Sequence, residues 1–122
     1  MSRLTRWESF RVALSGLVYA LRTQRNAQIE VIAATLVAAC GLWLGISWME
    51  WAILVIAIGV VFVAEMVNTA VEHVVDLVTT EWHDLARIAK DTAAAGVLTA
   101  ALIAFLVGVL VLGPHLWGII HR

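Results

Sequence analysis

The chain has 122 residues, of which 62% are hydrophobic, and its formal net charge at pH 7 is only -1. Soluble domains are about half apolar, so a mean hydropathy of +0.93 excludes a water-soluble protein and predicts a single membrane domain. The near-neutral charge and the lack of zinc-ligand motifs exclude a nucleic-acid partner. The one cysteine, Cys40, can form neither an intrachain disulfide nor a cysteine-ligated metal site, so we expect it to serve packing.

The first predicted element is an amphipathic helix over residues 5–24, approximately. Its apolar residues recur at intervals of three and four, whereas Arg11 and Arg22 fall on other faces of the helix. This pattern is typical of a helix in the membrane interface, either as a surface anchor or as one wall of an active site at the membrane surface. The apolar positions are Phe10, Ala13, Leu14, Leu17, Val18 and Leu21.

Three apolar segments follow, and they predict transmembrane helices at about residues 28–47, 50–76 and 91–113. A hydrocarbon core of about 30 Å needs about 20 helical residues, so the second span must continue past Glu65 into a polar stretch. Five arginines precede the first span, and Arg87 and Lys90 lie between the second and the third. The positive-inside rule therefore predicts a cytoplasmic N-terminus and a C-terminus outside.

Five polar residues of the second span share one helix face. Glu65, Asn68, Thr69, Glu72 and Asp76 are spaced so that they fall within an arc of about 100°. Three acids on one face repel one another, so they require metal cations, basic groups or protonation. Magnesium suits such oxygen ligands, because it takes one or two carboxylates together with substrate phosphates. Interhelical hydrogen bonding is the alternative for Glu65 and Asn68, but acids at membrane depth are costly and favour a functional site.

The segment at residues 79–91, TTEWHDLARIAKD, supplies charged groups on the cytoplasmic side. Taken alone, such a segment is most often a solvated connection. Lys90 can neutralise a phosphate or an acid, and Asp91 is predicted to cap the third span. Phosphoryl transfer needs metal-binding acids, a cation for the phosphates and a base near the acceptor hydroxyl, and all three kinds are present. The chain lacks the GxxxxGK[ST] and protein-kinase motifs, so its ATP site would be of another type.

The stretch at residues 64–98 resembles the signature of the small bacterial membrane kinases that include diacylglycerol kinase and undecaprenol kinase. The signature reads E-x-x-N-[ST]-A-x-E-x-x-x-D, followed by E-[YW]-H and A-K-D. The resemblance extends from Ser9 to about Leu112, nearly the whole chain. The matching residues are Glu65, Asn68, Thr69, Ala70, Glu72, Asp76, Glu81, Trp82, His83, Ala89, Lys90 and Asp91.

This resemblance implies an all-α integral membrane fold, with an N-terminal amphipathic surface helix plus three transmembrane helices, in the bacterial inner membrane. It implies a homotrimer with active sites between neighbouring subunits. The implied reaction transfers the γ-phosphate of ATP to a membrane lipid alcohol, with Mg²⁺ as cofactor. Glu65 would be the general base, Asn68 would shape the reaction centre, and Glu72 would bind the metal. The residues implied around the nucleotide are Gln24, Glu72, Asp76, Glu81, His83, Lys90 and Asp91, and those implied near the lipid are Glu65, Asn68 and Glu30.

Gln24 departs from the family pattern, which commonly has a second metal-binding glutamate at this position. A glutamine carbonyl can still ligate magnesium but brings no negative charge, so a second metal site would be weaker. Glu30 matches an acidic position of some members and could compensate, although an ordinary acid at a helix start fits equally well.

The segments VDLVTTEWH and LARIAKD, with Leu77 after Asp76, resemble the undecaprenol kinase branch more closely. Undecaprenol is therefore the expected acceptor. The alternatives are a diacylglycerol kinase that makes phosphatidic acid and a non-catalytic membrane regulator with the same fold. A proton or ion carrier would use Glu65 but would leave the A-K-D segment without a role.

Overall fold

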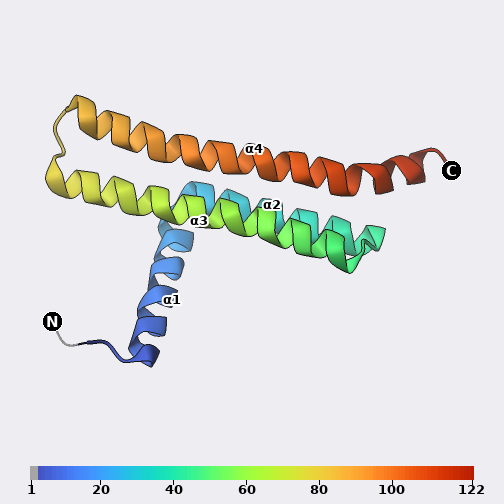
Figure 1. The fold of residues 1–122 in the computed structure, drawn as a ribbon, viewed down its shortest axis with the longest axis horizontal. Coiled ribbons are helices and arrows are strands. Elements are labelled where there is room, and N and C mark those ends of the chain that lie inside the picture. The colour runs from blue at the N-terminus through green and yellow to red at the C-terminus, as the bar shows by residue number, and fades with distance from the viewer. Residues whose placement is uncertain (1–2) are drawn as a thin grey trace.

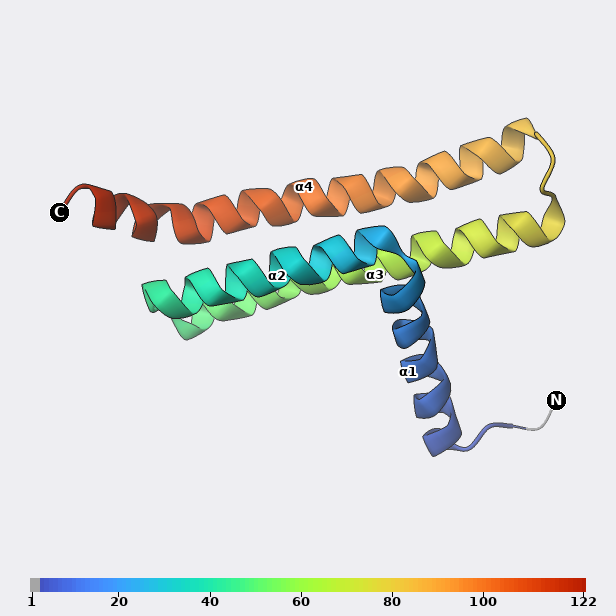
Figure 2. The same cartoon turned by 180° about the vertical axis from the view of Figure 1, so that it is seen from behind.

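The computed structural model describes residues 3–122, and all the regular structure in this range is helical. Its four helices are α1 (Arg6–Thr23), α2 (Arg25–Leu44), α3 (Trp48–Val78) and α4 (Asp84–Ile120). Helices α2, α3 and α4 run alongside one another in alternating directions, whereas α1 projects from their flank at a steep angle (Figures 1 and 2). By length and composition, α2, α3 and α4 could each cross a membrane. The predicted all-helical membrane fold with three candidate spans is confirmed at this level.

Helix α4 is longer than the apolar segment that predicted it. It begins at Asp84, because the Nδ1 atom of His83 accepts a hydrogen bond from the backbone N–H of Leu85 at 3.1 Å and caps the helix. Asp91 is therefore an interior residue of α4, and its carboxylate accepts a hydrogen bond from Arg87 at 3.2 Å. The prediction that Asp91 caps this helix is wrong. The charged side chains after α3 are presented mostly by a helix rather than by a loop.

Short local motifs fix three other helix ends. Thr5 and Glu8 form a capping box at the start of α1, and Ser47 and Glu50 form another at the start of α3. Helix α2 ends at Gly45, whose φ of +65° lies in the left-handed region that glycine adopts without strain. These motifs explain the tight turn between α2 and α3.

The corner between α1 and α2 is held by hydrogen bonds from one side chain. Gln24 has an extended backbone, with φ -101° and ψ 113°, so α1 and α2 do not continue as one helix. The Nε2 atom of Gln28 donates to the carbonyl oxygens of Leu21 and Arg22 at 3.2 and 3.3 Å. Terminal carbonyls of a helix lack intrahelical partners, so these bonds stabilise the corner. Two small buried residues allow the helices to meet closely there: Ala20 and Ala27.

The apolar core lies at the far end of the bundle from this corner. A Cβ added at Gly41 would lie only 2.9 Å from Cη2 of Trp51, so α2 and α3 are in close contact there. His115 Nε2 lies 2.8 Å from Glu50 Oε2 and joins the last part of α4 to the start of α3. Four buried residues form the centre of the core: Ile46, Leu54, Val111 and Leu112.

Candidate active site

The polar residues of α3 pass from buried to exposed along the helix. Glu65 is 2% exposed and is the largest fully buried side chain among the described residues, while Asn68 and Thr69 are each 6% exposed. Glu72 is half-buried and Asp76 is exposed. Since α3 is continuous, all five share the face that their spacing predicts. The stripe therefore joins the packed interior of the bundle to its solvent-exposed end.

The buried end of this stripe contains polar atoms without partners. Glu65 Oε2, Asn68 Oδ1 and Glu30 Oε2 are buried and have no hydrogen-bond partner in the described part of the chain. Each such atom costs about 1–3 kcal/mol, because its hydration is lost and nothing replaces it. Folded proteins keep such groups where a ligand, a water, an ion or another subunit supplies the missing contact.

An apolar groove adjoins this buried end. It has a volume of about 240 Å³ and is lined by apolar residues of α2, α3 and α4, including Val61 and Phe62. Glu30 is its one acidic lining residue, and Glu30 and Glu65 are close enough for their charges to interact. The structure thus brings together two acids, one from α2 and one from α3, and the acid from α2, Glu30, lines an apolar groove.

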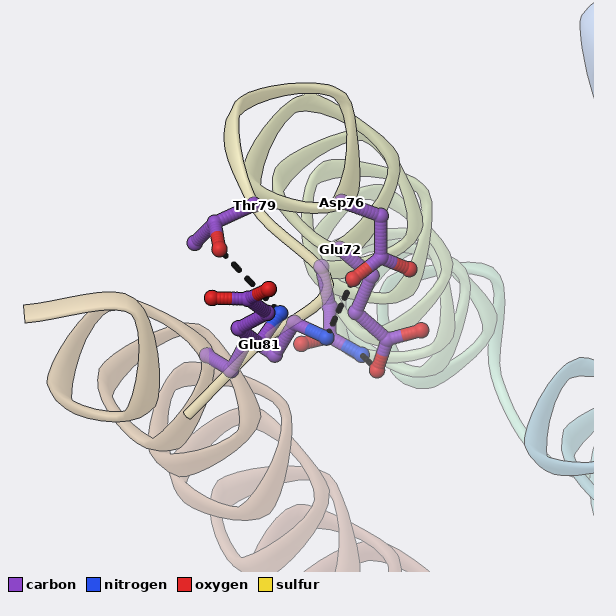
Figure 3. A network of polar contacts seen from close by, with 6 residues as sticks. Glu72, Asp76, Thr79 and Glu81 are labelled. Carbon is purple, nitrogen blue, oxygen red and sulfur yellow. Dashed lines mark hydrogen bonds and ion pairs between the residues drawn. The ribbon is translucent and has the colours of Figure 1, made fainter. Parts of the chain in front are cut away.

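Glu72 marks the middle of the stripe. The Nδ2 atom of Asn68 donates to Glu72 Oε1 at 3.4 Å, near the long limit for such a bond. Glu72 and Asp76 extend from α3 in the same direction (Figure 3). No group of three or more histidine, cysteine, aspartate or glutamate residues within residues 3–122 could hold a metal. Mg²⁺ needs only one or two protein carboxylates when phosphates complete its shell, so Glu72 fits this ion.

The exposed end of the stripe is joined to α4. Lys90 Nζ donates to Asp76 Oδ1 at 2.6 Å, which bridges the last turns of α3 and the first turns of α4. The backbone N–H of Glu81 donates to Thr79 Oγ1 at 3.1 Å and shapes the connection between the helices (Figure 3). Exposed ion pairs contribute only about 0–1 kcal/mol to the free energy of unfolding, so the main effect of the Lys90–Asp76 contact is to position the Lys90 ammonium group.

A pocket of about 290 Å³ opens at this connection. Its lining combines acids and bases with the indole of Trp82, which is 80% exposed. The guanidinium carbon of Arg87 lies 5.9 Å from the centre of the Trp82 ring, within cation–π range. Five of the residues that the sequence placed around a nucleotide line this one pocket: Asp76, Glu81, His83, Lys90 and Asp91.

Gln24 lies apart from that pocket, at the corner between α1 and α2. Its Nε2 atom donates to Thr23 Oγ1 at 3.4 Å, and no hydrogen bond between described residues links it to the polar stripe. The corner reaches α3 instead through Tyr19 and His73, whose Oη and Nε2 atoms lie 3.0 Å apart. The sequence analysis did not single out either residue, because no helical spacing relates positions 19 and 73.

Three helices that could span a membrane, with a polar stripe between an apolar groove and a charged pocket, are the features of an integral membrane enzyme. The family model described as prokaryotic diacylglycerol kinase matches residues 11–112. The chain belongs to the prokaryotic diacylglycerol kinase family and is therefore a lipid kinase, as the sequence predicted. As a member of a kinase family, it is expected to use ATP.

Several curated proteins are similar to this chain. It is 42% identical to undecaprenol kinase of Bacillus subtilis over 110 residues. The aligned region covers 90% of this chain and 89% of that protein. It is also 42% identical over 109 residues to diacylglycerol kinase of Synechocystis, covering 88% of this chain and 62% of that protein. Diacylglycerol kinase of Escherichia coli K12 is 31% identical over 86 residues, or 70% of each chain.

Proposed function

We propose that this protein transfers the γ-phosphate of ATP to the hydroxyl of undecaprenol, with Mg²⁺ as cofactor, at the cytoplasmic face of the membrane. One observation carries the proposal: the buried carboxylate of Glu65 has an unpartnered oxygen, and Glu65 lies one helical turn from Val61, which lines the apolar groove. A base at that position can reach the hydroxyl of a lipid whose chain remains in the hydrocarbon.

In the proposed reaction, the lipid hydroxyl oxygen attacks the γ-phosphorus of ATP. The new oxygen–phosphorus bond forms as the bond to the bridging oxygen of ADP breaks, and Glu65 Oε2 takes the hydroxyl proton. Asn68 holds the reacting groups between Glu65 and Glu72. Mg²⁺ held by Glu72, with the carbonyl of Gln24 as a weaker second ligand, would neutralise charge on the phosphate oxygens.

The charged pocket beyond Glu72 is the proposed nucleotide site. Lys90 supplies a point charge that phosphate oxygens can share with Asp76, and the 2.6 Å contact between these two side chains holds the ammonium group at the pocket wall. His83 caps the start of α4 by accepting a hydrogen bond from Leu85, and Glu81 shapes the connection by donating one to Thr79. Asp91 is kept in the lining by Arg87.

Undecaprenol is favoured over diacylglycerol by two lines of support. The match to the undecaprenol kinase of Bacillus subtilis extends over nearly the full length of both proteins. The sequence around Leu77 also resembles that branch. Diacylglycerol is the second candidate, because a diacylglycerol kinase of Synechocystis is equally identical to this chain.

The decisive assay uses the purified protein in lipid, with labelled ATP and Mg²⁺, and offers undecaprenol and diacylglycerol in parallel. We expect label in the undecaprenol product at a rate well above that in phosphatidic acid. Glu72→Gln provides the matched inactive control. Faster labelling of diacylglycerol would replace the proposed acceptor, and no labelling of either lipid would reject the proposed function.

The proposed placement is a single membrane domain in a bacterial inner membrane, with spans at about residues 28–47, 50–76 and 91–113. Helix α3 has 31 residues and is about 46 Å long, so its last turns extend beyond a hydrocarbon core of about 30 Å and bring Asp76 to the water. The arginines before α2 favour a cytoplasmic N-terminus and an outer C-terminus.

Helix α1 is proposed to lie on the membrane surface. It makes a steep angle with the three long helices, so it runs along the bilayer when they cross it (Figure 2). Trp7 and Phe10 stack with ring centroids 6.0 Å apart and are 68% and 59% exposed, as a lipid-facing anchor requires.

We further propose a homotrimer. The unpartnered oxygens of Glu30 and Glu65 and of the Asn68 amide leave a single chain with an incomplete site. Small residues along α4, among them Gly96 and Ala101, permit close approach by a neighbouring helix. Cross-linking in lipid should give trimers, and an active monomer in mild detergent would reject this assembly.

A further inference from the structure

One side-chain pair links the helix of the acidic stripe to the corner that carries Gln24. Tyr19 Oη lies 3.0 Å from His73 Nε2, within hydrogen-bond distance, and which group donates depends on the imidazole tautomer. The two rings also pack in a tilted arrangement, with centroids 5.6 Å apart and an interplanar angle of 56°. Both residues lie outside the stripe itself.

Both residues lie close in sequence to a proposed metal ligand. His73 follows Glu72 directly on α3, and Tyr19 lies in the last turns of α1, shortly before Gln24. Gln28 already fixes α1 to α2 at this corner. The two ends of the corner are thus joined, and the Tyr19–His73 contact is the one side-chain hydrogen bond that links α1 to α3 among the described residues.

We propose that Tyr19 and His73 are positioning residues, whose hydrogen bond sets the separation between Gln24 and Glu72 and so completes the Mg²⁺ site. This inference rests on the proposed function. Gln24 has no charge that would attract it to the metal. Its position therefore depends on contacts within the protein.

A purely structural role fits the pair less well. Tyr19 is 46% exposed and His73 is also exposed, so the contact is accessible to water. The two hydrogen bonds from Gln28 and the buried Ala20 and Ala27 hold the corner together without it. Loss of the pair should thus shift the corner while the helices stay folded.

The test compares Tyr19→Phe, His73→Ala and the double variant with the wild type in lipid, by titrating Mg²⁺ at saturating ATP and undecaprenol. We expect the Mg²⁺ concentration for half-maximal rate to rise about fivefold in each single variant, the size of one neutral hydrogen bond, and no further in the double variant. The rate at saturating Mg²⁺ should stay within about twofold.

Three more variants separate positioning from general damage. His73→Gln places an amide near the position of Nε2 and should restore most of the Mg²⁺ affinity. Ser15→Ala removes another hydroxyl from α1, and His121→Ala removes another histidine, so neither should move the titration. An unmoved Mg²⁺ titration in Tyr19→Phe, additive effects in the double variant, or a loss confined to the saturated rate would overturn the proposal.

A spectroscopic measurement tests the Tyr19–His73 hydrogen bond independently of turnover. In ¹⁵N-histidine-labelled protein in lipid, the ring resonance that disappears in His73→Ala should shift in Tyr19→Phe, while the other histidine resonances stay in place. Paramagnetic Mn²⁺ with ATP should broaden the His73 resonance at lower concentration in the wild type than in Tyr19→Phe. If the wild type phosphorylates neither lipid, the proposed function fails, and these shifts still decide the inference. Unshifted resonances, or equal Mn²⁺ concentrations, would reject it.

Discussion

Replacing Glu65 by glutamine should separate the chemical step from nucleotide binding. Glu65 and Glu72 are seven positions apart on the continuous helix α3, which places them about 10 Å apart along the axis. In the proposed mechanism, Glu65 acts as a base on the lipid hydroxyl, while Glu72 acts on the metal and phosphates. Glutamine keeps the volume of the buried side chain but cannot take the proton.

The expected size of the effect follows from general base catalysis, which contributes about 10²–10⁴ in rate, or about 3–5 kcal/mol of activation free energy. Glu65→Gln should lower turnover by at least about 100-fold. Its 2% exposure leaves little room for a water to replace the carboxylate. No cavity is created, so the melting temperature should change little.

The assay measures ATP affinity and turnover on purified Glu65→Gln and Glu72→Gln in lipid. Glu65→Gln should bind Mg²⁺ and ATP within about threefold of the wild type, whereas Glu72→Gln should lose both binding and turnover. Equal loss of ATP binding in the two variants would refute the separation of roles. Near-normal turnover of Glu72→Gln at limiting Mg²⁺ would refute its assignment as the principal metal ligand.

Three further outcomes are expected. Gln24→Glu should lower the Mg²⁺ concentration for half-maximal activity, because it adds a charged oxygen to the proposed site, and an unmoved titration would place Gln24 elsewhere. Gly41→Ala should lower thermal stability by about 1–3 kcal/mol in denaturation experiments, since its methyl would collide with Trp51, and unchanged stability would mean that the ring moves freely. Gly45→Ala should cost about 1–2 kcal/mol in the same assay, because its φ of +65° is unfavourable for alanine, and a neutral result would contradict that backbone conformation.

Much of this fold follows from local sequence. The apolar segments predict α2 and α3, and the offsets from Glu65 to Asp76 predict their common face. The start of α4 was missed because His83 is an uncommon capping residue, whereas Asp91 is a common one. The end was missed because α4 continues through Pro114, a residue that more often ends a helix.

The candidate site was only partly predictable. Neighbours on one helix, such as Asn68 and Glu72, are visible in the spacing of the sequence. Contacts between helices are not visible in the spacing, because they depend on how the helices cross. Tyr19 and His73, for example, meet only because of the angle between α1 and α3. The Lys90–Asp76 contact is intermediate, since the short connection after α3 brings its flanking turns together.

The apolar core of the bundle and the acidic stripe of α3 lie toward opposite ends of the three long helices, so the interior is packed differently along its length. Around Leu54 and Leu112, close packing resists any relative movement of the helices. Around Glu65, the buried groups are polar, and three of their oxygens have no hydrogen-bond partner among the described residues. Substitutions in the core should therefore alter melting temperature more than turnover, and substitutions near Glu65 should do the reverse.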